Sequence, residues 1–172
     1  MSELQIRTAT IKDVGILNEI GRQTFEETFR DTNTSENLTR YLDESFNQEQ
    51  LMRELSHPSS FFYLATREDL VVGYLKLNVG DAQTEFSQQG GLEIERIYVI
   101  KEYWGKSVGQ ALLDYALGIA AGQKNSFVWL GVWEKNYRAL RFYRKNGFVP
   151  FDQHIFQVGD DPQTDLLMKK ML

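Results

Sequence analysis

The sequence predicts a mixed α/β fold with one parallel strand–helix–strand step near its middle. Two stretches, at 92–99 and 126–133, have the length and residue types of strands. Between them lie a turn with glycines at 105 and 109 and a stretch with helical periodicity. Two parallel neighbours in a sheet need such a crossover, which is right-handed in nearly all proteins.

The first part of the chain predicts a strand followed by a helical region. Residues 4–8 alternate as a short strand does, and Thr10 and Asp13 have the spacing of a capping box at the start of the next helix. A second helical region begins after Thr34, and Asn47 offers a cap for a third piece that Pro58 closes. The first helix carries an apolar stripe at helical spacing, formed by Val14, Leu17, Ile20, Phe25 and Phe29.

The remaining elements flank the central step. Residues 61–66 and 70–78 predict an antiparallel pair, and the polar stretch 80–91, which ends in glycines, predicts a mobile loop. A helix opens at Asn136 and ends near Gly147 and Phe148. Residues 149–158 and 164–171 predict two final strands, with a turn at 159–162.

Composition bounds the class of protein. The 172 residues, 42% of them hydrophobic, suit a single domain spanning 1–172, and the absence of cysteine excludes disulfides, thiolate metal sites and cysteine nucleophiles. His57 and His154 have no metal-ligand spacing, so no metal is expected. Neither a signal peptide nor a membrane span is visible, which predicts a cytoplasmic protein. The net charge of −5 argues against a nucleic-acid surface and leaves room for a cationic partner.

The first helices carry an excess of acids. Between Arg22 and Leu55 there are eight acidic residues and four arginines. An ordinary solvated face explains this excess, and so does an acidic rim that attracts a polycation to a nearby cleft. The acids are Glu26, Glu27, Asp31, Glu36, Asp43, Glu44, Glu49 and Glu54.

The turn at 104–109 is the first candidate binding site. Gly105 and Gly109 allow backbone to approach a ligand, and the following helix presents unpaired N–H groups and a partial positive charge. That combination suits a phosphate-bearing cofactor, although glycines before helices are also common in α/β proteins without one.

The helix after the second central strand carries a specific motif of the form Asn-x-x-Ala-x-x-Phe-Tyr-x-x-x-Gly-Phe. Its six fixed positions are Asn136, Ala139, Phe142, Tyr143, Gly147 and Phe148. With the preceding strand–turn–helix unit, this motif resembles the GNAT superfamily of N-acetyltransferases over essentially the whole chain. The resemblance implies a mostly antiparallel sheet with helices on both faces, acetyl-CoA as cosubstrate, and a ternary complex in which the amine attacks directly.

The glycine turn follows the family pattern only in part. Where the family prefers Gln or Arg the chain has Trp104, and where it prefers its first loop glycine the chain has Ser107. Gly109 keeps its place, and Lys106 offers a cation near phosphate. In the family this loop wraps the CoA pyrophosphate with backbone N–H groups, so the two departures bear on CoA affinity.

A narrower resemblance is to the PaiA-type spermidine/spermine acetyltransferases, which implies a polyamine as acetyl acceptor. It also leaves a homodimer open, since the sequence does not determine the oligomeric state. The segments that carry it are 47–51, 81–83, 92–98, 129–136 and 163–166.

The resemblance assigns roles to several residues. Glu95 takes the place of a proposed base, with Glu93 in reserve, and strand alternation puts both on one face with Ile97 and Val99. Tyr143 matches the tyrosine that protonates the leaving thiolate. The expected cofactor-binding residues are Ile97, Tyr98, Val99, Gly105, Lys106, Ser107, Val108, Gly109, Gln110, Asn136, Ala139 and Tyr143.

Other functions stay open from the sequence alone. The same chemistry serves enzymes for protein N-termini, lysines or small amines, and the altered loop also fits a CoA-binding regulatory module without catalysis. Trp129 and Trp133 flank the second central strand, where they wall a cleft or, more simply, pack in the core.

Overall fold

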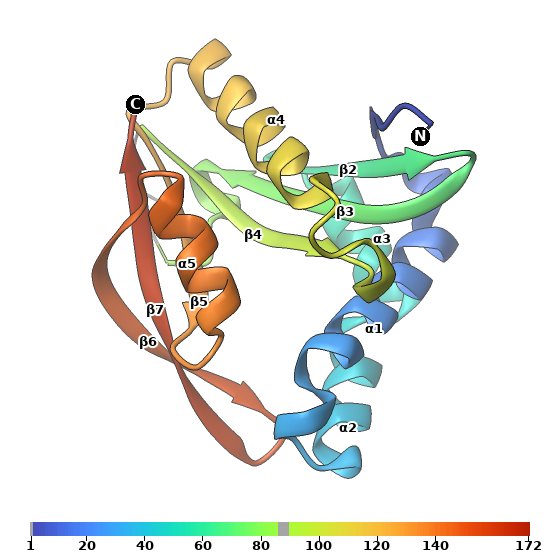
Figure 1. Cartoon of the computed structure of the whole chain (residues 1–172). Coiled ribbons are helices and arrows are strands. Elements are labelled where there is room, and N and C mark those ends of the chain that lie inside the picture. The colour runs from blue at the N-terminus through green and yellow to red at the C-terminus, as the bar shows by residue number, and fades with distance from the viewer. Residues whose placement is uncertain (1, 86–89) are drawn as a thin grey trace.

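The computed structural model describes residues 2–85 and 90–172, and its described strands form one mixed sheet in the order β1-β2-β3-β4-β5-β7-β6 (Figure 1). Among them, β4 and β5 make the one parallel pair. This confirms the predicted fold class. The strands are β1 Gln5–Thr8, β2 Ser60–Arg67, β3 Leu70–Val79, β4 Gly91–Val99, β5 Phe127–Trp133, β6 Val149–Val158 and β7 Asp161–Met171.

Helices cover both faces of this sheet. On β3, Gly73 faces Leu112 of α4, whereas Lys76, on the opposite face of the strand, meets Glu54 of α3. Figure 1 shows α5 running alongside β5 and β7, apart from α1 and α2. No helix in the described part of the chain is long and apolar enough to cross a membrane. The helices are α1 Val14–Phe29, α2 Ser35–Ser45, α3 Gln48–Ser56, α4 Val108–Gly122 and α5 Tyr137–Lys145.

The predicted helix starts are confirmed. The Asp13 carboxylate accepts a hydrogen bond from the Thr10 N–H at 2.8 Å and completes the capping box before α1. The side chains of Thr34 and Asn47 cap α2 and α3. Each cap satisfies an N–H group that has no partner inside its helix.

The loop before β4 is described only in part. Gly80–Ala82 forms a short 3-10 turn, and the Trp129 Nε1–H donates to Gln83 at 2.8 Å. Residues 86–89 of the predicted mobile loop lie outside the described residues.

The predicted alternation along β4 is wrong, because the strand carries a bulge at Glu95. Lys76 pairs with Arg96 but Leu77 pairs with Ile94, which leaves Glu95 without an opposite residue on β3. Cross-strand partners share a face, so Glu93, opposite Asn78, lies on the same face as Arg96. Ile97 lies on the other face with Ile94, and Glu93 therefore points toward the side that α1 and α3 cover.

Strands β4 and β5 pair over a short distance only. Their register runs from Gly91 opposite Phe127 to Glu93 opposite Trp129, while β4 continues to Val99. Beyond Glu93, the edge of β4 that faces β5 has no strand partner among the described residues. The two strands diverge there, and the divergence opens the sheet.

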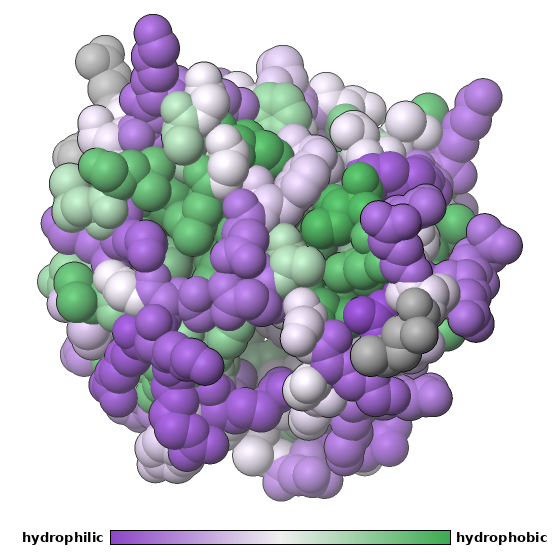
Figure 2. Space-filling view, turned by 45° about the horizontal axis from the view of Figure 1, so that its top comes forward, coloured by the Kyte–Doolittle hydropathy of each residue, from purple (hydrophilic) through white to green (hydrophobic). Residues whose placement is uncertain are grey.

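The acids of the first helices are largely neutralised by neighbours. Ion pairs hold five of the eight acids counted above, and the Glu27 carboxylate accepts the Lys101 N–H at 2.7 Å. On the face drawn in Figure 2, hydrophilic side chains surround two apolar areas. The five are Glu26, Glu36, Asp43, Glu49 and Glu54.

Candidate active site

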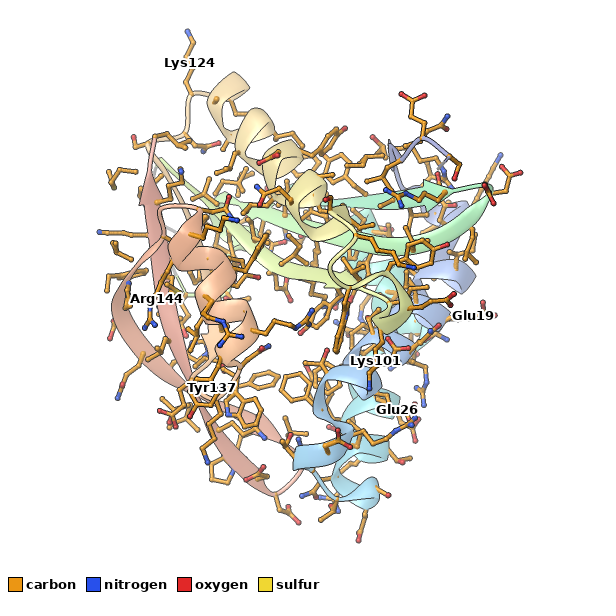
Figure 3. The ribbon with its side chains drawn as sticks, viewed as in Figure 1. Glu19, Glu26, Lys101, Lys124, Tyr137 and Arg144 are labelled. Atoms are coloured by element: carbon orange, nitrogen blue, oxygen red, sulfur yellow. The ribbon has the colours of Figure 1, made fainter. Side chains whose placement is uncertain are left out.

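A cavity of about 690 Å³ lies where β4 and β5 diverge. It is bounded by β4, the turn before α4, β5 and α5, with aromatic residues of α1 and α2 on its far side. In Figure 3, Tyr137 of α5 lies on one side of the space between α5 and α1, and Glu26 of α1 and Lys101 lie on the other. The predicted site residues that line the cavity are Glu95, Ile97, Tyr98, Val99, Gly105, Ser107, Gly109, Gln110, Asn136, Ala139 and Tyr143.

Two predicted cofactor-binding residues do not line the cavity. The Val108 side chain is fully buried and packs beside Gly73, so this residue offers a ligand only its backbone. Lys106 is exposed, and its ammonium lies 4.9 Å from the centre of the Tyr103 ring. The structure therefore places the Lys106 charge outside the cavity wall.

The turn before α4 has the backbone shape of an anion-binding site. Gly105 and Ser107 both have positive φ, at 75° and 65°. Ser107 is the residue before α4, and its side chain makes no capping hydrogen bond, so the first N–H groups of the helix have no side-chain partner there. Such groups, with the helix dipole, favour negative charge.

We predict that Ser107→Gly stabilises the protein by up to about 1 kcal/mol. A non-glycine residue in the left-handed region costs roughly 1–2 kcal/mol, and the flexibility of glycine in the unfolded chain offsets part of that gain. The measurement is urea unfolding of both proteins. A lower midpoint for the glycine variant would contradict the prediction.

Trp104, which departs from the family pattern, links the two sides of the opening. Its Nε1–H donates to the Val99 carbonyl at 2.8 Å, and the Arg138 guanidinium of α5 stacks 3.6 Å from its ring centre. Sequence reasoning missed Arg138, because a basic residue on a polar helix face carries no signal of its own. The stack joins the turn to α5 across the cavity.

Helix α5 presents Tyr143 and Asn136 to the cavity. The Asn136 side chain accepts the Ala139 N–H at 3.2 Å and caps the helix. Tyr143 is 8% exposed, and burial raises the pKa of its hydroxyl. The hydroxyl therefore keeps its proton at neutral pH and is available as a donor.

The two candidate bases differ in their surroundings. The Glu95 carboxylate lies 2.5 Å from the Lys76 ammonium and 3.7 Å from the Arg96 guanidinium, and the Asn78 amide donates to it at 2.6 Å. Lys76 and Arg96 also hold Glu54, at 3.0 and 2.8 Å. Glu95 is therefore one carboxylate of a neutralised network of two acids and two bases.

Glu93 has no cationic neighbour in the described residues and is 3% exposed. It accepts hydrogen bonds from the Thr84 N–H at 2.9 Å, the Thr84 hydroxyl at 2.5 Å and the Asn78 amide at 3.0 Å. Burial raises the pKa of Glu93, and these hydrogen bonds oppose the rise without cancelling it. Glu93 therefore holds a proton more readily than an ordinary glutamate does.

The far end of the cavity is aromatic and acidic. Phe29 of α1 packs against Trp133 with ring centres 5.8 Å apart, and Tyr41 packs against Phe156 at 5.6 Å. Asp165 of β7 and His154 of β6 complete this wall. Trp129 is 1% exposed, so it packs in the core and also touches the cavity.

None of the eight acids of the first helices lines the cavity. Of the two interpretations that the sequence leaves open, this favours the solvated face, since five of the eight acids are exposed and Glu54 forms ion pairs with Lys76 and Arg96. The cavity has carboxylates of its own, which come from strands β4 and β7. They are Glu93, Glu95 and Asp165.

Comparison with known proteins assigns the family. The model of the acetyltransferase (GNAT) family matches residues 22–148, which include the turn before α4, Tyr143 and both candidate bases. The chain is a GNAT acetyltransferase. It is accordingly an N-acetyltransferase, with acetyl-CoA as its acetyl donor.

Relatives of this GNAT chain share its full length. It is 40% identical over all of its residues to an uncharacterised N-acetyltransferase of Lactobacillus delbrueckii subsp. lactis, and the match covers 99% of that protein. It is 25% identical to a spermidine N(1)-acetyltransferase of Thermoplasma acidophilum, over 97% of this chain and 96% of that one.

A solved structure shares the GNAT fold of this chain. The PaiA N-acetyltransferase of Thermoplasma acidophilum, crystallised with coenzyme A, aligns with a TM-score of 0.81 at 24% identity and covers 99% of each chain. The fold of this chain, with its seven-stranded sheet, is therefore one that has been observed in a crystal structure.

Proposed function

We propose that the acetyl acceptor is a polyamine such as spermidine or spermine. The observation that carries this proposal is the lining of the cavity, where the carboxylates of Glu93 and Asp165 lie among aromatic rings. Ammonium groups bind favourably to carboxylates and to the faces of aromatic rings. The similarity to a spermidine N(1)-acetyltransferase over nearly the whole chain supports the same acceptor class.

The turn before α4 and the free edge of β4 suit the donor. The residues present fit CoA, since an uncapped helix start with two positive-φ residues can bind phosphate and an unpaired strand edge can bind an amide-containing arm. We propose that the backbone of Ile97, Tyr98 and Val99 holds the pantetheine arm. When bound, acetyl-CoA supplies an activated thioester.

We expect that Gly109→Val weakens CoA binding tenfold or more. A Cβ added at Gly109 would lie 4.0 Å from Val99 Cγ2, its nearest neighbour outside the adjoining backbone, so the first atom of a side chain meets no clash there. A loss of affinity would then report contact with the ligand rather than damage to the fold. Calorimetry with CoA makes the measurement, and unchanged affinity with an unchanged melting temperature would contradict this placement.

The amine that accepts the acetyl group needs a base nearby that can take up its proton. An amine with a pKa near 10 is about one part in a thousand neutral at pH 7, a deficit of about 4 kcal/mol. Our sequence-based candidate was Glu95, with Glu93 in reserve. We now propose Glu93 as the base, directly or through water, because Glu95 is already paired with Lys76. Glu95 in turn belongs to the neutralised network with Lys76, Arg96 and Glu54.

Two other groups complete the proposed chemistry. Backbone N–H groups on the free edge of β4 are suited to stabilise negative charge that develops on the acetyl oxygen. The Tyr143 hydroxyl, which keeps its proton at neutral pH, is suited to protonate the departing thiolate.

Turnover with a panel of amines tests the acceptor class. We expect a higher kcat/KM for spermidine or spermine than for a monoamine of similar size, because each additional ammonium can pair with a cavity carboxylate. Peptides with a free N-terminus and aminoglycosides serve as competing acceptors. Equal specificity constants for polyamine and monoamine at low salt would contradict the proposal.

A further inference from the structure

The strand register separates Asp165 from the proposed base along one face of the sheet. Glu93 is level with Trp129 on β5, and Asp165 is level with Trp133, four residues further along the same strand. At roughly 3.3 Å per residue, that step is about 13 Å. Paired residues share a face, so both carboxylates enter the cavity from the same side of the sheet.

His154 lies between Asp165 and another carboxylate. Its Nε2 is 3.3 Å from Asp165 Oδ2, and its Nδ1 is hydrogen bonded to Glu85. The His154 ring thus already contacts Oδ2 of Asp165, whereas Oδ1 makes no hydrogen bond or ion pair in the described part of the chain.

The cavity floor between the two ends is open at Gly131. This residue lies in the middle of β5, yet it is exposed and lines the cavity, and it has no side chain where its partner on β7, Leu167, carries a large one. A Cβ there would lie 3.4 Å from Asp165 Oδ2 and 3.7 Å from His154 Cε1. A glycine inside a strand weakens it and often marks close approach of a ligand.

We infer that Asp165 sets the length of the acceptor by binding the distal ammonium of a chain that crosses Gly131 while its reacting amine lies at Glu93. This inference rests on the proposed function and deepens it, since it selects acceptors whose two amine groups are separated by a distance comparable to that step of about 13 Å over monoamines and short diamines. His154 opposes this binding, because its Nε2 competes with the ammonium for Oδ2 of Asp165.

Asp165→Asn tests the binding role without changing the shape of the side chain. We expect KM and the dissociation constant for spermidine to rise about tenfold or more, with a smaller change in kcat/KM for propylamine, because the hydrogen bond to the distal ammonium loses its negatively charged acceptor. Asp152→Asn is the matched control, since Asp152 is exposed on β6, outside the cavity, and its loss changes the net charge equally.

His154→Gln tests this competition. We expect spermidine to bind about threefold tighter, because the ring that contacts Oδ2 of Asp165 is gone. A loss of packing would weaken spermidine binding in both Asp165→Asn and His154→Gln. Opposite effects of these two substitutions would therefore indicate a role in recognition rather than damage to the fold. Gly131→Leu, which fills the floor, should weaken the binding of spermidine more than the binding of propylamine.

Calorimetry with spermidine in the presence of CoA keeps the two proposals distinguishable. If no amine is acetylated but Asp165→Asn still weakens spermidine binding tenfold, the proposed reaction fails and the recognition site stands. If polyamines are acetylated and Asp165→Asn has the same constants as Asp152→Asn, the inference is overturned and the proposed function stands. Tighter binding for Asp165→Asn would also overturn it.

Discussion

Glu93→Gln is expected to lower kcat with a polyamine by about 10²- to 10⁴-fold, the usual contribution of a positioned base. Glutamine keeps the shape of the side chain and can still accept from Thr84 and Asn78, but it cannot take up a proton. The variant should therefore fold, bind CoA and bind the amine, and fail in the chemical step. Steady-state kinetics at saturating substrates measures the effect.

The pH profile separates Glu93 from Glu95. Burial raises the pKa of Glu93 above its usual 4.5, so kcat/KM should fall as pH drops through that raised value, where the carboxylate becomes protonated and stops acting as a base. This acidic limb should vanish in Glu93→Gln and persist in Glu95→Gln. The reverse pattern would return the role to Glu95.

Tyr143→Phe is expected to lower kcat by up to about 10²-fold, with a smaller change in KM for acetyl-CoA. General acid catalysis contributes 10²–10⁴-fold, and the lower end applies because a thiolate, with a pKa near 8.5, leaves readily. Steady-state turnover measurements at saturating acetyl-CoA give kcat, and calorimetry with CoA gives the affinity.

Tyr63→Phe provides the control for this tyrosine, because Tyr63 is also buried and packs against Tyr115, away from the cavity. Its loss of a hydroxyl should leave kcat unchanged. Full turnover by Tyr143→Phe at saturating substrates would show that its hydroxyl has no role in the reaction.

Local sequence signals determined the elements and one half of the site. Caps at Thr10, Thr34 and Asn47 act on N–H groups two or three residues away, so they can be recognised in the sequence. The motif from Asn136 to Phe148 is likewise local, because one helix and its end carry all six positions. Most of the residues that the family resemblance assigns to the cofactor, among them Ile97, Gln110 and Tyr143, line the cavity.

The acceptor side was decided by tertiary structure. A one-residue bulge at Glu95 reverses which face Glu93 occupies, and nothing in the residue types of β4 announces it. The acidic helices, conspicuous in the sequence, turned out to be paired with arginines and lysines, several of them distant in the chain. The number of charges in a segment does not show the direction in which each side chain points.

The tertiary structure also decided which residues that are distant in the sequence meet at the cavity. Asp165 and His154 reach the cavity because β7 inserts between β5 and β6, a pairing set by long-range strand order. Trp104 meets Arg138 because β4 and β5 part after Glu93. The sequence alone determined that this chain folds as a GNAT enzyme that binds acetyl-CoA, since local motifs encode that. Which carboxylates face the amine depends on register and strand order, which are properties of the assembled sheet.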